Sequence, residues 1–126
     1  MIRIDVKKQG YLVEEVRVSG HAGGKEGTDI VCAAVSAVTQ TTLAGLLHHS
    51  EEQVNWSTHK GQLTIQIPSH IEARMQEIAQ ILLSTMLIGL EPISRSYPQR
   101  VAIYINAIRV KHTSHTSSSS RKRRTP

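Results

Sequence analysis

A pair of strand-like segments followed by a helical segment occurs twice in this 126-residue chain, and this order restricts the fold more than any other feature. Apolar and polar residues alternate over residues 2–8 and again over residues 11–19, on either side of the turn Gln9-Gly10. This pattern predicts a hairpin. The same alternation predicts a second pair of strands and a closing strand, with the apolar positions Val54, Trp56, Leu63, Ile65, Ile67, Val101, Ile103 and Ile105.

A helix is expected after each pair of strands. The first should run from about Ile30 to His49 with Asp29 as its N-cap, and the second from about Ile71 onward, with Gly89 and Pro92 weakening its end. Apolar residues three or four apart predict the buried stripes Val31, Val35, Val38, Thr42 and Leu46, and Ile71, Met75, Ile78, Leu82 and Met86. The order ββαββαβ predicts an α+β two-layer domain, with both helices on one face of a mainly antiparallel sheet.

We expect a single domain, residues 1–110, because a chain of this length with 39% hydrophobic residues can fill one core. Residues 111–126 form a Ser-rich basic tail, and the absence of apolar residues from His112 onward predicts that it is disordered. Arg121-Lys122-Arg123-Arg124 supplies four of the 15 basic residues, which leaves 11 basic against 10 acidic residues elsewhere. The net charge of +5 therefore belongs mainly to the tail.

The chain has one cysteine, so it cannot form an internal disulfide, and nothing suggests an oxidising compartment. Its N-terminus alternates in polarity and lacks the apolar stretch of a signal peptide, and we judge no segment long enough to span a bilayer. A cytoplasmic protein without membrane association is therefore expected.

The candidate catalytic residues lie between Gly20 and Ser36. Cys32 would be the third residue of the first helix, where unpaired backbone N–H groups and the positive end of the helix dipole favour a thiolate. His21 lies eleven residues earlier, in a loop whose flexibility is predicted by Gly20, Gly23, Gly24 and Gly27. A loop that bends back would bring the imidazole to the thiol as its base. The alternative is an inert, buried cysteine and a histidine that only packs.

Two further residues have open roles. Asp29 either caps the helix or orients His21. Ser36 lies four residues after Cys32 on the same side of the helix. Its hydroxyl either lines the pocket or assists the thiol, or it only bonds to a backbone carbonyl. Backbone N–H groups at the helix start are candidates for stabilising an oxyanion. No phosphate-binding Gly-Lys-Ser/Thr occurs, and one cysteine with scattered histidines argues against a zinc site, so we expect no metal and no organic cofactor.

Gly20-His21-Ala22-Gly23 followed by residues 27–36 (Gly-Thr-Asp-Ile-Val-Cys-Ala-Ala-Val-Ser) resembles the ribosomal-processing cysteine protease family, Prp. Gly45-Leu46 and Tyr97-Pro98 agree with it, and the resemblance covers about residues 1–110. It differs at Gly24-Lys25, where the family loop usually carries an aromatic residue and is about one residue longer.

The resemblance implies a cytosolic, homodimeric endopeptidase that removes a short N-terminal extension from the large-subunit ribosomal protein numbered twenty-seven. It maps the catalytic pair onto His21 and Cys32, and the motif aspartate and serine onto Asp29 and Ser36.

Our leading hypothesis is therefore a Cys–His peptidase whose substrate is a ribosomal protein precursor. The alternative is a non-catalytic ribosome- or RNA-associated binding protein that uses a sheet edge and the basic tail, and a third reading is a redox-sensing dimer. The second helix is apolar over more than one face, since Ile81, Leu83, Leu87 and Ile88 lie beside its main stripe, and this predicts a dimer contact.

Overall fold

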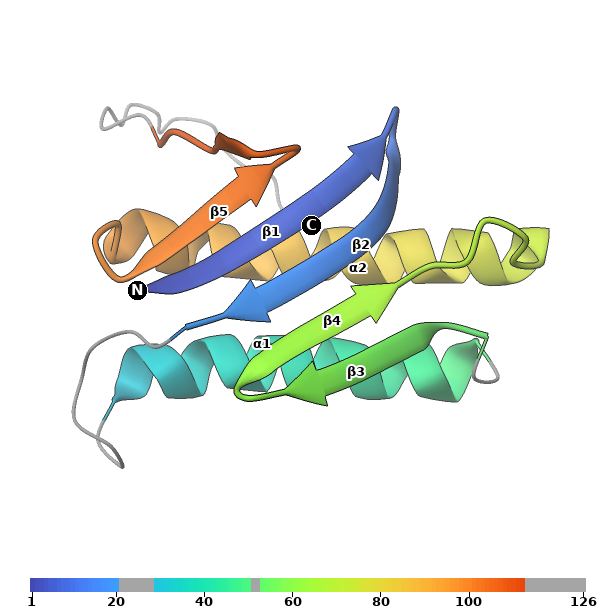
Figure 1. The fold of residues 1–126 in the computed structure, drawn as a ribbon, viewed down its shortest axis with the longest axis horizontal. Coiled ribbons are helices and arrows are strands. Elements are labelled where there is room, and N and C mark those ends of the chain that lie inside the picture. The colour runs from blue at the N-terminus through green and yellow to red at the C-terminus, as the bar shows by residue number, and fades with distance from the viewer. Residues whose placement is uncertain (21–28, 51–52, 113–126) are drawn as a thin grey trace, which may run out of the picture.

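The computed structural model describes residues 1–20, 29–50 and 53–112, which form two layers (Figure 1). One layer is a six-stranded sheet of order β3-β4-β2-β1-β5-β6, and the helices α1 and α2 both cover one of its faces. The elements in chain order are β1 (Ile2–Gln9), β2 (Leu12–Ser19), α1 (Ile30–His49), β3 (Asn55–His59), β4 (Gln62–Gln66), α2 (Ala73–Ser96), β5 (Val101–Ile105) and β6 (Ile108–Arg109).

The topology confirms the predicted fold class. The hairpins β1–β2 and β3–β4 are antiparallel, and β2 joins them by pairing with β4. Strand β5 returns beside β1 and pairs with it in parallel, so the first strand of the chain lies inside the sheet. Strand β6 was not predicted, because two residues are too few to give an alternating pattern.

Helix α1 has the predicted bounds, and four of its five predicted buried residues are buried. Val38 is only partly buried, whereas Thr39 and Leu43 belong to the buried side. The Thr39 hydroxyl donates a hydrogen bond of 2.9 Å to the Val35 carbonyl, which satisfies this polar group within the core.

Helix α2 differs more from its prediction. It begins at Ala73 and continues through Gly89 and Pro92 to Ser96. Pro92 removes the donor that would normally bond to the Ile88 carbonyl, and Ile88 lies on the exposed side of the helix, where water can bond instead. The predicted stripe was wrong in part, since Ile78 and Leu82 are only partly buried. The buried residues of α2 are Met75, Ala79, Leu83, Met86, Leu90 and Ser94.

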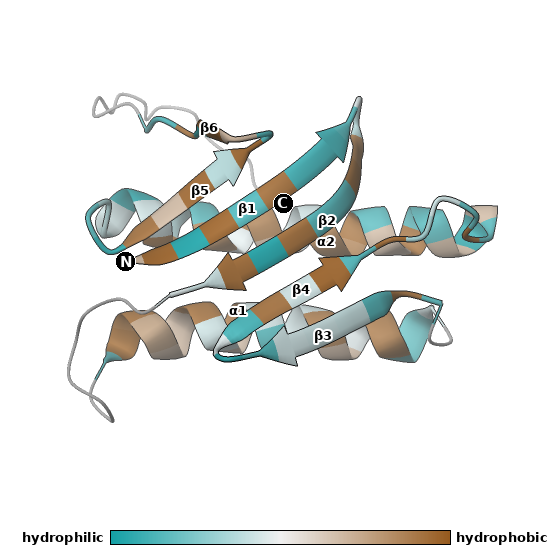
Figure 2. Ribbon diagram, in the orientation of Figure 1, coloured by the Kyte–Doolittle hydropathy of each residue, from teal (hydrophilic) through white to brown (hydrophobic). Residues whose placement is uncertain are grey.

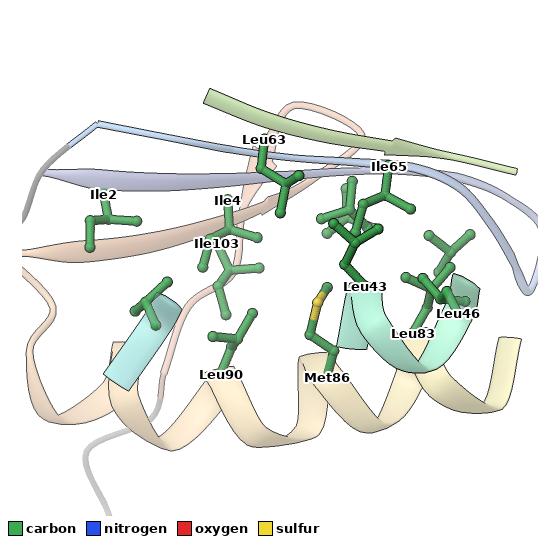
Figure 3. Packing of buried hydrophobic residues seen from close by; sticks show 14 of the residues in the cluster. Ile2, Ile4, Leu43, Leu46, Leu63, Ile65, Leu83, Met86, Leu90 and Ile103 are labelled. Carbon is green, nitrogen blue, oxygen red and sulfur yellow. The ribbon is translucent and has the colours of Figure 1, made fainter. Parts of the chain in front are cut away.

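The core lies between the inner face of the sheet and the two helices (Figure 3). Ile4 and Ile65 from the sheet and Leu46, Leu83 and Leu90 from the helices are at most 1% exposed. Apolar and polar residues alternate along much of β1 and β2 (Figure 2), and most of the apolar ones are buried. At the edge of the sheet Trp56 remains 48% exposed.

Both helices are long and apolar enough to cross a membrane by length and composition. The expectation that no segment is long enough was therefore wrong. Core helices meet the same criterion, and the buried sides of both helices pack in the core shared with the sheet.

The C-terminal end of the described chain lies against α2. His112 Nε2 is 3.0 Å from Ser94 Oγ, and His112 Nδ1 is 2.9 Å from a carboxylate oxygen of Glu91. Arg95 also binds Glu91, and this hydrogen bond, with a smaller contribution from His112, lowers the pKa of the Glu91 carboxyl group below its ordinary value. The domain boundary near residue 110 stays a prediction.

Candidate active site

The N-terminus of α1 is fixed by Asp29. Its backbone is extended, with φ −83° and ψ 97°, and its Oδ1 accepts hydrogen bonds of 3.0 Å each from the backbone N–H groups of Val31 and Cys32. The Asp29 carbonyl accepts a further bond of 3.1 Å from the N–H group of Ala33. The capping role predicted for Asp29 is therefore present in the structure.

This cap changes one expectation for the site. The backbone N–H groups of Val31, Cys32 and Ala33 already donate to Asp29, so they are not oriented to stabilise an oxyanion. The suggestion that helix-start N–H groups perform this task is wrong for these three residues.

Cys32 lies in the first turn of α1, is partly buried, and packs against the core cluster. It also lines a groove of about 400 Å³ between α1 and the β3–β4 hairpin. Ser36, one helical turn later, is exposed and lines the same groove. A ligand in this open groove can reach Cys32, whereas it could not reach an inert cysteine in a closed core.

The groove has apolar and polar walls, and the other described residues that line it carry no charge. Its apolar residues are Ile2, Val18, Val35 and Leu63. Its polar residues, besides Cys32 and Ser36, are Thr39, Gln40, Thr58 and Gln62.

Gly20 also lines the groove, and the backbone conformation there explains why this position is glycine. Its φ of +89° is rarely adopted by residues with a side chain, and an added Cβ would lie 2.2 Å from the carbonyl oxygen of Met1. Glycine therefore allows the end of β2 to pass directly beside the start of β1.

Sequence reasoning missed Arg100, which lies just before β5. Arg100 Nη2 donates a hydrogen bond of 3.2 Å to Asp29 Oδ1, the same atom that caps the helix. The Asp29 side chain is only 9% exposed, so this ion pair is shielded from water on one side. The two residues are 71 positions apart, and no local pattern marks such a contact.

The remaining predicted site residues, His21, Gly23, Gly24 and Gly27, lie outside the described residues. The structure thus brings Gly20, Cys32 and Ser36 to one groove and places Asp29 next to Cys32. Among residues 1–20, 29–50 and 53–112, no group of three or more His, Cys, Asp or Glu side chains is arranged to hold a metal ion.

Residues 1–102 match the model of the family described as cysteine protease Prp. The chain belongs to this family. The ribosomal processing cysteine protease Prp of Staphylococcus aureus strain Mu50 is 32% identical over 108 residues, which cover 82% of this chain and 97% of the relative. The protein of the same name from Bacillus subtilis strain 168 is 29% identical over 94 residues, or 72% and 84% of the two chains.

Solved structures of a Prp protease agree with the fold. The S. aureus Prp with a covalently linked product peptide superimposes with a TM-score of 0.74 at 27% identity, over 84% of this chain and all of that one. The S. aureus Prp with a substrate peptide gives a TM-score of 0.71 at 26% identity, with the same coverage. The present chain is accordingly a cysteine protease of the Prp family with its characteristic two-layer fold.

Proposed function

We propose that this Prp-family protease removes a short N-terminal extension from a precursor of the large-subunit ribosomal protein numbered twenty-seven, with Cys32 as nucleophile and His21 as base. The observation that carries the proposal is the position of Cys32, in a capped first helical turn and at the wall of a groove. The names of the S. aureus and B. subtilis relatives, ribosomal processing cysteine proteases, support the substrate class.

The proposed reaction is acyl transfer through the thiol. His21 accepts the proton of Cys32 Sγ, and the thiolate attacks the carbonyl carbon of the scissile peptide bond. The C–N bond breaks, the departing amine takes a proton from the imidazolium, and a thioester to Cys32 remains. Water then attacks the thioester, releases the new carboxylate and restores the thiol. The groove next to Cys32 would receive the substrate residues that flank the scissile bond.

We also propose a homodimer. Ile81 and Ile88 are 65% and 72% exposed and lie seven residues apart, on the same side of α2. Two large apolar side chains on one outer helical face are suited to contact with a second copy. We further propose that the protein acts in the cytoplasm and that the cluster at 121–124 adds a salt-sensitive attraction to ribosomal RNA.

The test is cleavage of a peptide that spans the junction between the extension and the mature ribosomal protein. We expect the wild-type protein to cut it, and Cys32→Ala, Cys32→Ser and His21→Ala to lose more than about 99% of the rate, because each removes the nucleophile or its base. Ser57→Ala, on exposed strand β3, is the matched control and should cut normally.

Mass spectrometry of the products identifies the cut bond, and circular dichroism verifies that each variant is folded. Normal cleavage by Cys32→Ala would refute the proposed peptidase mechanism. Absence of cleavage by the wild type, together with retained binding to ribosomes, would favour the alternative of a non-catalytic ribosome-associated protein.

A further inference from the structure

We propose that Arg100 is a positioning residue of the cysteine site, which neutralises the capping carboxylate of Asp29 and so protects the thiolate form of Cys32. The proposal rests on the proposed role of Cys32 as nucleophile. It concerns a contact between two parts of the chain, the start of α1 and the turn between α2 and β5.

The need for Arg100 follows from two opposing requirements at the start of α1. The cap requires an acceptor, and Asp29 Oδ1 serves both the Val31 and Cys32 N–H groups at 3.0 Å. A carboxylate this close to Cys32, and only 9% exposed, would also repel a thiolate in the same helical turn. A positive charge paired with the carboxylate leaves the cap intact and reduces that repulsion.

Arg100 meets this requirement because its guanidinium lies 3.2 Å from the capping oxygen itself. Asp29 Oδ1 therefore accepts three N–H donors, two from the helix and one from Arg100. The other described residues that line the groove with Cys32 are uncharged.

The backbone of Arg100 is itself held in place. Its N–H group donates to the Tyr97 carbonyl at 2.9 Å, and its carbonyl accepts from the Ile2 N–H group at 2.8 Å, next to the start of β1. The guanidinium carbon is 6.0 Å from the centre of the Tyr97 ring. The start of β1, the end of β2, the start of α1 and the α2–β5 turn meet at one end of the sheet (Figure 1), so the ion pair ties the cysteine-bearing turn to a fixed part of the fold.

The experiment measures the rate of Cys32 alkylation by iodoacetamide as a function of pH, which needs no peptidase activity. In Arg100→Gln, the midpoint of the pH–rate curve should rise by about 0.5–1 pH unit, as the loss of one nearby compensating charge predicts. Arg100→Lys keeps the charge, so its midpoint should lie close to that of the wild type. Arg17→Gln removes an arginine from an ion pair with Glu15 on strand β2 and should leave the curve unchanged.

The mechanism is tested by removing both charges. Asp29→Asn/Arg100→Gln retains a side-chain oxygen for the cap, and its midpoint should lie within about 0.3 pH unit of the wild type. The double variant also decides the matter if Arg100→Gln alone does not fold. An unchanged midpoint in folded Arg100→Gln, or a raised midpoint in the double variant, would overturn the proposal.

A peptide-cleavage assay tests the role of Arg100 and the peptidase assignment separately. At pH values below both midpoints, Arg100→Gln should lower kcat by about 3–10-fold with KM changed less than about twofold, because the charge affects the nucleophile and not the groove. A wild-type protein that alkylates but never cuts would refute the peptidase assignment and leave the effect of Arg100 on the thiol measurable.

Discussion

Replacing Gly20 with alanine should destabilise the protein far more than the same change at other glycines with positive φ. Alanine at φ +89° requires a backbone conformation that costs a residue with a side chain about 1–2 kcal/mol. The new Cβ would also lie 2.2 Å from the Met1 carbonyl oxygen, so Met1 must move. That movement disturbs the adjacent 2.8 Å hydrogen bond from the Ile2 N–H group to the Arg100 carbonyl, a bond worth about 1 kcal/mol.

The sum, less the gain of about 0.4–1 kcal/mol from a less flexible unfolded chain, predicts a loss of about 2 kcal/mol in the free energy of unfolding for Gly20→Ala. Gly10→Ala and Gly61→Ala are matched controls, because these glycines have φ of +60° and +78° but nothing within 4 Å of an added Cβ. Each control should lose only about 1 kcal/mol, since it bears the backbone cost without the collision and gains from a less flexible unfolded chain.

The assay is urea denaturation followed by circular dichroism, with the midpoint and the slope fitted separately so that a change in stability is distinguished from a change in the unfolded state. If Gly20→Ala is no less stable than Gly10→Ala and Gly61→Ala, the close approach of β2 to the start of β1 is not rigid and our account of Gly20 is refuted.

Three further predictions concern other parts of the fold. Asp29→Ala should lower the free energy of unfolding by about 1–2 kcal/mol through loss of the N-cap. Asp29→Asn retains an acceptor oxygen and should lose clearly less stability, and equal losses in urea denaturation would contradict the capping role. Sedimentation at micromolar concentration should show a dimer that Ile81→Ser/Ile88→Ser converts to a monomer, and a wild-type monomer would remove the dimer proposal. The pKa of Glu91 is lowered in the folded protein, so its contribution to stability is present above its ordinary pKa of 4.5 and is lost as the pH falls below that value. Between about pH 5 and pH 3, Glu91→Gln should therefore lose less stability than the wild type. Plots of unfolding free energy against pH that are equally steep for both proteins would refute this contribution.

Local patterns predicted most of the fold because each element is specified by neighbours in the sequence. Alternation located β1, β2, β4 and β5, and Asp29 marked the start of α1 to the residue. Helix α2 was placed less well for two reasons. Pro92 lies inside the helix, and the carbonyl that it leaves without a donor belongs to the exposed residue Ile88. Burial of the small residue Ala79 shifts the stripe that large apolar residues had suggested.

The site was predictable only where it is local. Cys32, Asp29 and Ser36 could be grouped because they share one stretch of helix. The contact of Arg100 with Asp29, and the part of the groove supplied by Thr58 and Gln62, depend on how distant segments pack, and a single sequence gives no periodic signal for such contacts.

The parallel pairing of β1 with β5 has a consequence for the order in which the protein can be completed during synthesis. The partners of the first strand, from Ile2 opposite Val101 to Val6 opposite Ile105, are translated about a hundred residues later. Until then β1 has a neighbour on one side only, and the Arg100 contacts with Ile2 and Asp29 cannot form. A growing chain therefore carries Cys32 well before the structure around it is assembled, and the mature geometry of the cysteine site appears only after nearly the whole domain has left the ribosome.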